Sequence, residues 1–120
     1  MRFLNARIHG YLDLVLVALL VIGPLVMGLG GTPAAICYAL AVVHLLLTLL
    51  TDYPLGARKV IPLFVHGLVE LLAGVMMLVL PSILGFGPGS PAKRFYTFAG
   101  AAILVIWVLT DYGRKSEPRP

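Results

Sequence analysis

Two histidine–carboxylate pairs lie inside apolar stretches of the sequence, and they are the residues best suited to do chemistry. His9 precedes Asp13 by four positions, and His66 precedes Glu70 by four positions at a place 57 residues further along the chain. Residues four apart share one face of a helix, so each histidine can contact its own carboxylate. The recurrence predicts a duplicated arrangement built around a polar pair.

The composition places these pairs in a membrane. Of the 120 residues, 60% are hydrophobic and only 12% are charged, whereas about a quarter of residues are charged in a soluble domain. The net charge of +4 does not indicate a nucleic-acid partner, because the basic residues lie at the ends of apolar stretches instead of forming a patch. The chain is therefore predicted to be an integral membrane protein with the lipid bilayer as its partner.

Four apolar stretches are long enough to cross a bilayer, which requires about 20 residues in a helix. They are expected at about 4–27, 34–51, 58–80 and 92–110, with Pro24 and Pro81 interpreted as helix-ending residues. Gly67, Gly74 and Gly100 are expected to allow close helix approach. The predicted fold is all-α, a four-helix transmembrane bundle forming one membrane domain over residues 1–120, with 114–120 as a flexible basic tail.

Lysine and arginine in short loops predict the orientation. Seven of the nine basic residues fall on the side that holds both termini and the 52–59 loop, and the other two are Lys93 and Arg94. Both termini are therefore expected in the cytoplasm. Cys37 is the single cysteine, which excludes an internal disulfide.

The duplication extends beyond the histidine pairs. Two helices per unit give both units the same orientation, related by a pseudo-twofold axis along the membrane normal. The predicted repeats cover about 4–56 and 58–113. Further matching positions are Pro24 and Pro81, Gly28 and Gly85, and the Thr-Asp-Tyr segments 51–53 and 110–112.

Together with the histidine pairs, these segments carry a family resemblance. The chain resembles the small bacterial SPW-repeat membrane proteins, although Gly23-Pro24-Leu25 and Leu80-Pro81-Ser82 keep only the proline of the Ser-Pro-Trp tripeptide. The resemblance implies a bacterial inner-membrane location and two tandem two-helix units, and it implies no activity. Its motifs are His9 with Asp13, Thr51-Asp52-Tyr53-Pro54-Leu55-Gly56, Ile61-Pro62, His66 with Glu70, and Gly85-Phe86 after Pro81.

A helical rise of about 1.5 Å per residue places the three histidines at one depth below the cytoplasmic boundary, with the two carboxylates one turn deeper. Ionisable residues at such depth usually face the bundle interior or a water-filled cavity. The sequence thus predicts one buried cluster, here called the polar cluster. It consists of His9, Asp13, His44, His66 and Glu70.

Several roles for the polar cluster stay open. The leading interpretation is a non-enzymatic membrane protein, an oligomer or a partner subunit, in which hydrogen bonds of the cluster organise the bundle. Imidazoles and carboxylates also suit a transition metal, and two histidines on different helices suit haem. Histidine–carboxylate chains also carry protons in pumps, although polar residues here reach only one side of the membrane. An enzyme acting on a lipid or quinone is the remaining alternative.

Overall fold

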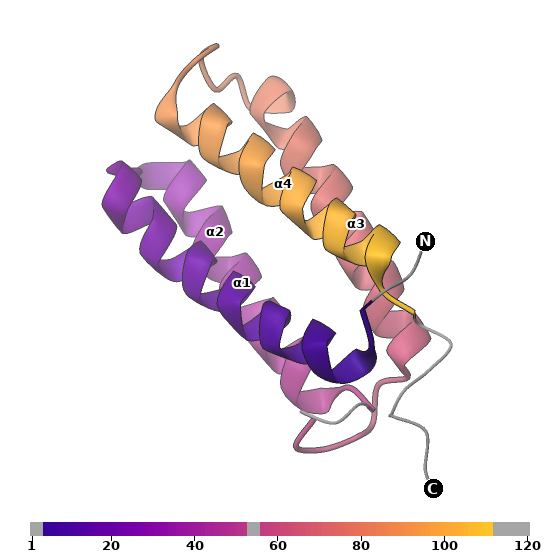
Figure 1. Ribbon diagram of the computed structural model, residues 1–120. Coiled ribbons are helices and arrows are strands. Elements are labelled where there is room, and N and C mark those ends of the chain that lie inside the picture. Colours follow the sequence, from indigo (N-terminus) through magenta and orange to yellow (C-terminus); the bar gives the residue numbers. More distant parts are fainter. Residues whose placement is uncertain (1–3, 53–55, 112–120) are drawn as a thin grey trace, which may run out of the picture.

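Four α-helices follow one another along the chain and pack as a bundle in the computed structural model, which describes residues 4–52 and 56–111 (Figure 1). Each is long and apolar enough to cross a membrane, which confirms the predicted fold class. Tyr53, Tyr112, Arg2 and the tail at 114–120 lie outside the described residues. The helices are α1 (Ala6–Met27), α2 (Gly31–Leu50), α3 (Leu63–Ile83) and α4 (Pro91–Leu109).

Glycines, and not the prolines, end α1 and α3, which corrects one expectation. Pro24 lies inside α1 and Pro81 inside α3. Each proline carbonyl accepts a hydrogen bond of 2.8 Å from the backbone N–H of the residue five positions later. The glycine just before that donor residue has a left-handed φ, which is 70° at Gly28 and 72° at Gly85. These bonds satisfy backbone carbonyls that have no partner within the helix at its C-terminal end. The motif favours glycine, because a residue with a side chain is strained at positive φ.

The third helix also begins later than expected, at Leu63 instead of near residue 58. Pro62 precedes it, and a residue before proline is biased toward extended backbone. Ile61 is accordingly not helical, and it pairs with the end of α2. The second helix begins three residues earlier than expected, at Gly31.

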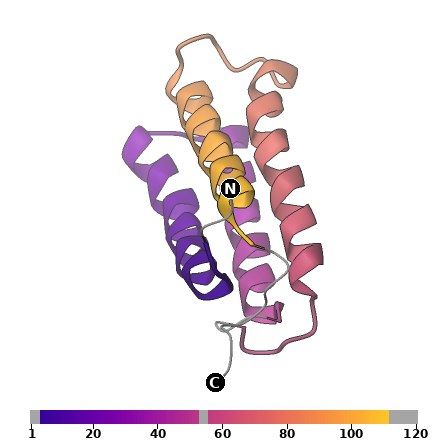
Figure 2. The ribbon, with the colours of Figure 1, turned by 45° about the vertical axis from the view of Figure 1, so that its right-hand side comes forward.

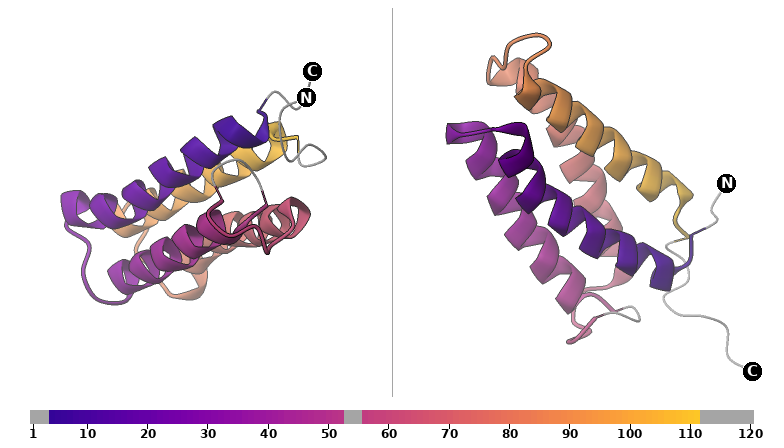
Figure 3. Two further views of the ribbon diagram at one scale, coloured as in Figure 1. Left: turned by 90° about the horizontal axis from the view of Figure 1, so that it is seen from below. Right: turned by 60° about the vertical axis from the view of Figure 1, so that its left-hand side comes forward.

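The helices form two hairpins, α1 with α2 and α3 with α4. Both hairpin turns lie at one end of the bundle, and the connection from α2 to α3 lies at the other (Figure 1). α4 stands between α3 and α1 (Figure 2). Seen from below, α1 and α4 form one layer and α2 and α3 form the other (Figure 3).

Two short backbone pairings join the hairpins at the end opposite the turns. Leu4, just before α1, pairs in parallel with Thr110 after α4, and Thr51 after α2 pairs in parallel with Ile61 before α3. Each pairing contains two backbone hydrogen bonds of 2.7–3.0 Å. The start of each helix that carries a His–carboxylate pair is thereby held beside a threonine that ends another helix.

Apolar packing fills the half of the bundle nearer the turns. Its buried residues include Leu20, Met77 and Tyr96, and the Tyr96 hydroxyl donates to the carbonyl of Pro33 at 2.6 Å. Gly74 and Gly100 allow α3 and α4 to pack closely, because neither residue has a side chain. A Cβ at Gly100 would lie 2.9 Å from the carbonyl oxygen of Gly74, and a Cβ at Gly74 would lie 2.7 Å from Leu104 Cδ2. The predicted role of Gly74 and Gly100 in close helix approach is therefore confirmed.

Candidate functional site

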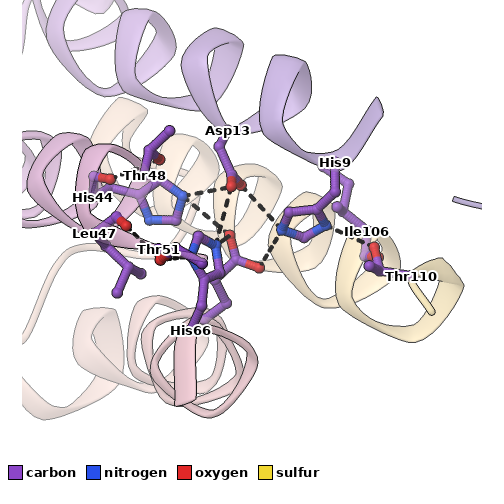
Figure 4. A network of polar contacts seen from close by, with 10 residues as sticks. His9, Asp13, His44, Leu47, Thr48, Thr51, His66, Ile106 and Thr110 are labelled. Carbon is purple, nitrogen blue, oxygen red and sulfur yellow. Dashed lines mark hydrogen bonds and ion pairs between the residues drawn. The ribbon is translucent and has the colours of Figure 1, made fainter. Parts of the chain in front are cut away.

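The five residues of the polar cluster come together in the interior of the bundle, from α1, α2 and α3 (Figure 4). None exposes more than 5% of its surface. Apolar helices predict a bilayer around them, where isolated charges cost at least a few kcal/mol each. The buried groups must therefore compensate one another's charges.

Each histidine directs its Nε2 atom at both carboxylates (Figure 4). His9 Nε2 lies 3.2 Å from Asp13 Oδ1 and 2.8 Å from Glu70 Oε1. His66 Nε2 lies 3.0 Å from Asp13 Oδ2 and 3.2 Å from Glu70 Oε2. His44 Nε2 lies 3.2 Å from Asp13 Oδ1 and 3.1 Å from Glu70 Oε2.

The closest contacts of His9 and His66 cross between α1 and α3. The spacing of four predicted contacts within each helix, and these are present at 3.2 Å. The contacts to the carboxylate of the other helix are shorter, at 2.8 and 3.0 Å. The two histidine–carboxylate pairs are therefore one interlocked group.

Two buried threonines contact the opposite ring nitrogens. His9 Nδ1 lies 2.7 Å from Thr110 Oγ1, and His66 Nδ1 lies 2.8 Å from Thr51 Oγ1. Each hydroxyl donates its own proton to the carbonyl four residues earlier, that of Ile106 for Thr110 and that of Leu47 for Thr51. A hydroxyl has one proton to donate, and a carbonyl can only accept. Each threonine must therefore accept a hydrogen bond from the Nδ1–H of its histidine.

This arrangement fixes the tautomer of both rings. With the proton on Nδ1, a neutral imidazole carries a lone pair on Nε2, the atom that faces the carboxylates. A bare lone pair beside a carboxylate oxygen is repulsive, so a proton or a metal cation must lie between them. It can be a second proton on each of His9 and His66, or a cation that all four groups share.

The two alternatives leave the same net charge. Two imidazolium rings balance the two carboxylates, with His44 neutral and donating its Nε2–H to Asp13 and Glu70. One divalent cation balances the same two carboxylates with all rings neutral. Both fillings suit a buried site, because neither leaves an uncompensated charge.

Four residues of the polar cluster are also close enough together to be candidate ligands of one metal ion. His9, Asp13, His66 and Glu70 can each offer one ligand atom such that all four lie within 4.8 Å of one another. Metal–ligand bonds of about 2.0–2.2 Å set neighbouring ligand atoms about 2.8–3.6 Å apart at angles of 90–109°. His9 Nε2 lies 2.8–3.2 Å from Glu70 Oε1 and Asp13 Oδ1, and His66 Nε2 lies 3.0–3.2 Å from Asp13 Oδ2 and Glu70 Oε2, so each nitrogen has an oxygen of both carboxylates at this spacing. His9, Asp13, His66 and Glu70 are called the four-ligand set.

Haem fits this arrangement poorly. The rings of His9 and His66 have centroids 5.4 Å apart and are inclined by 73°. Oxygens of Asp13 and Glu70 contact both Nε2 atoms, so they occupy the space that a porphyrin plane would need between two axial ligands. The donor set of imidazoles and carboxylates suits a bare ion better.

His44 holds a different position from the other two histidines. It reaches the carboxylates from α2, and it also lines an apolar cavity of about 140 Å³ with residues of all four helices. Ile103, which the repeat would place opposite His44, is a buried apolar residue in α4. His44 is thus the asymmetric member of the polar cluster.

Thr51 and Thr110 are the functional residues that sequence reasoning missed. They stood out only as the first residues of the recurring Thr-Asp-Tyr segments. The signal that could have found them is the recurrence itself, because both threonines end a helix and both match across the duplication. The backbone pairings at 4 with 110 and 51 with 61 place each threonine beside the start of the helix that carries its histidine.

No protein-family model, curated protein or solved structure matches the chain. The resemblance to SPW-repeat proteins therefore stays a prediction.

Proposed function

We propose that the protein binds one divalent transition-metal ion inside the membrane, through His9, Asp13, His66 and Glu70. The observation that carries the proposal is the pair of threonine hydroxyls that aim both Nε2 lone pairs at shared carboxylates. Metal-binding histidines almost always donate their second ring N–H to an outer partner, which fixes tautomer and orientation. Thr110 and Thr51 are the outer partners in this proposal.

Two nitrogen and two oxygen donors suit Zn²⁺, Fe²⁺ and related first-row ions better than Mg²⁺ or Ca²⁺, which prefer oxygen ligands alone. His44 contacts the carboxylates and is assigned to orient them. The ion would fasten α1 to α3, two helices that belong to different hairpins. An ion held there would organise the bundle, which is the role that the leading sequence interpretation gives to the polar cluster.

Proton conduction is the weaker alternative. Among the described residues, the buried polar and charged side chains belong to the polar cluster and to the threonines near it. Between the cluster and the hairpin turns, the core is formed by apolar side chains and by Tyr96, whose hydroxyl donates to Pro33. In this half the core cluster offers the Cys37 thiol and the Tyr96 hydroxyl and contains no histidine or carboxylate, so the histidine–carboxylate chain does not continue across it.

We further propose that the chain is a tandem repeat with a pseudo-twofold axis along the membrane normal. Three relationships support it. The backbone pairing of Leu4 with Thr110 matches that of Ile61 with Thr51. The hydrogen bond between His9 and Thr110 matches that between His66 and Thr51. The helix end at Gly28 matches the helix end at Gly85. The four-ligand set would then obey the symmetry that His44 breaks.

The proposed location is the bacterial inner membrane, with both termini in the cytoplasm and the cluster nearer that side. The distribution of basic residues supports the orientation, and the SPW-repeat resemblance supports the location. A role as an oligomer or as a partner subunit is compatible with a metal that stabilises the bundle.

Cobalt substitution tests the metal proposal. Co²⁺ added to metal-free protein in detergent should give visible absorption bands that saturate at one ion per chain. The bands should disappear in His66→Ala and persist in Thr48→Val, whose hydroxyl donates to the His44 carbonyl in the wild type. Saturable binding that survives in His66→Ala would refute the assigned ligands.

A further inference from the structure

An apolar groove runs between α1 and α4 in the half of the bundle nearer the turns. Its volume is about 620 Å³, within the range of about 300–1,000 Å³ that is usual for ligand pockets. The ring of Phe95 packs against Gly23, where a Cβ would lie 2.3 Å from Phe95 Cε1. Other lining residues are Val15, Ala18, Leu19, Ile22, Val26 and Phe98.

One cation lines this groove and a second lies next to it. Arg94 is part of the groove wall, and it also lines an adjoining hollow of about 390 Å³ with Lys93 and Thr97. The Arg94 guanidinium donates to the carbonyl of Gly89, a neutral acceptor. The apolar groove therefore has a basic end, formed by Arg94 and Lys93.

Within residues 4–52 and 56–111, no carboxylate forms an ion pair with either of these two cations. The sequence has no acidic residue between Asp13 and Asp52, and none between Glu70 and Asp111. Lys93 and Arg94 also lie in the first turns of α4, where the helix dipole disfavours positive charge. An anion from outside the chain would offset both effects.

We propose that the groove between α1 and α4 binds an anionic glycerophospholipid. Its phosphate contacts Arg94 and Lys93, and one acyl chain lies along the apolar wall formed by α1. Arginine can bind a phosphate through two parallel N–H bonds, and basic sites between transmembrane helices recognise anionic head groups. The groove and the cations together match an amphiphile with a negative head, and this proposal does not depend on the metal site.

Native mass spectrometry of detergent-purified protein tests the proposal, with phosphatidylglycerol and phosphatidylcholine of identical acyl chains added separately. Wild-type protein should retain phosphatidylglycerol preferentially. The double variant Lys93→Gln/Arg94→Gln should lower its apparent affinity by about 10- to 30-fold, because each basic contact contributes to binding an anionic lipid. Arg58→Gln/Lys59→Gln removes the same charge elsewhere in the chain and should leave the preference unchanged.

A second variant tests the groove without changing any charge. Ala18→Phe fills the apolar wall and should also weaken phosphatidylglycerol binding, with helical content by circular dichroism unchanged. Equal retention of the two lipids by wild-type protein would overturn the proposal, as would equal losses in the two charge variants. Disulfide-linked dimers of Ala18→Cys in a Cys37→Ala background would also overturn it, because a second copy would then cover the groove.

Discussion

His9 Nδ1 lies 2.7 Å from Thr110 Oγ1, although 101 positions separate the two residues in the sequence. The hydroxyl accepts this bond because its own proton goes to the carbonyl of Ile106. The end of the last helix thus determines which nitrogen of a histidine in the first helix faces the carboxylates. Thr51 does the same for His66 at 2.8 Å.

Removing either threonine hydroxyl should weaken metal binding. Thr110→Val and Thr51→Val preserve side-chain shape but leave the Nδ1–H without its acceptor, so the ring loses its fixed tautomer. Loss of such an outer partner typically lowers metal affinity by about 10- to 100-fold, and a competition titration with a chromophoric chelator would measure it. Thr48→Val is the matched control. Wild-type affinity in both variants would show that the threonines do not orient the ligands.

The three histidines should not contribute equally. His66→Ala and His9→Ala remove ligands from the four-ligand set and should abolish stoichiometric binding. His44→Ala removes a group outside the four-ligand set whose Nε2 contacts the two carboxylates, so binding of one ion per chain should persist with affinity reduced by about 10- to 100-fold. The same titration compares all three variants, and complete loss in His44→Ala would assign His44 as a ligand.

Metal binding should release protons and strengthen as the pH rises. In the metal-free cluster, two protons balance the two carboxylates, and a divalent ion replaces both. Apparent affinity should therefore rise by about 100-fold per pH unit while both protons are bound, since ligands must be deprotonated. Measurement of proton release in weakly buffered detergent solution should give about two protons per ion. Release of no protons would contradict the assigned charge balance.

Gly100 should be intolerant of even a methyl group. In Gly100→Ala the new Cβ would lie 2.9 Å from the carbonyl oxygen of Gly74, so α3 and α4 must move apart. Overpacking of this kind costs about 1–3 kcal/mol of unfolding free energy, measurable by thermal unfolding followed through Trp107 fluorescence. Gly87→Ala is the control, because its new Cβ meets only Ser90 Cβ at 4.0 Å. Equal midpoints for the two variants would argue against close packing at Gly100.

The orientation can be tested by cysteine labelling in a Cys37→Ala background. Arg58→Cys should react with a membrane-impermeant maleimide only after the cytoplasmic side is opened, whereas Lys93→Cys should react in intact cells. Four spans place these positions on opposite sides of the membrane. Labelling of both from the same side would contradict the four-span topology.

The sequence predicted the polar cluster because ionisable residues in membrane-spanning helices are costly to expose to lipid, so all five are expected to face the interior of the bundle. It could not predict that His9 would lie closer to Glu70 than to Asp13, because that depends on how α1 packs beside α3. Likewise, Thr110 contacts His9 where Leu4 pairs with Thr110, a contact between distant parts of the chain. The prediction that Pro24 and Pro81 end their helices was wrong, because both prolines lie in the last turn and their carbonyls accept the hydrogen bonds that close α1 and α3.

Metal analysis of purified protein is the most direct test of the metal proposal. Wild-type protein and His66→Ala would be purified in detergent without chelators, and their divalent metal content would be measured by inductively coupled plasma mass spectrometry, with Thr48→Val as control. We predict about one ion per chain in wild-type protein and in Thr48→Val, and none in His66→Ala. Wild-type protein that holds no metal after exposure to Zn²⁺ and Fe²⁺, while remaining folded, would contradict the proposal.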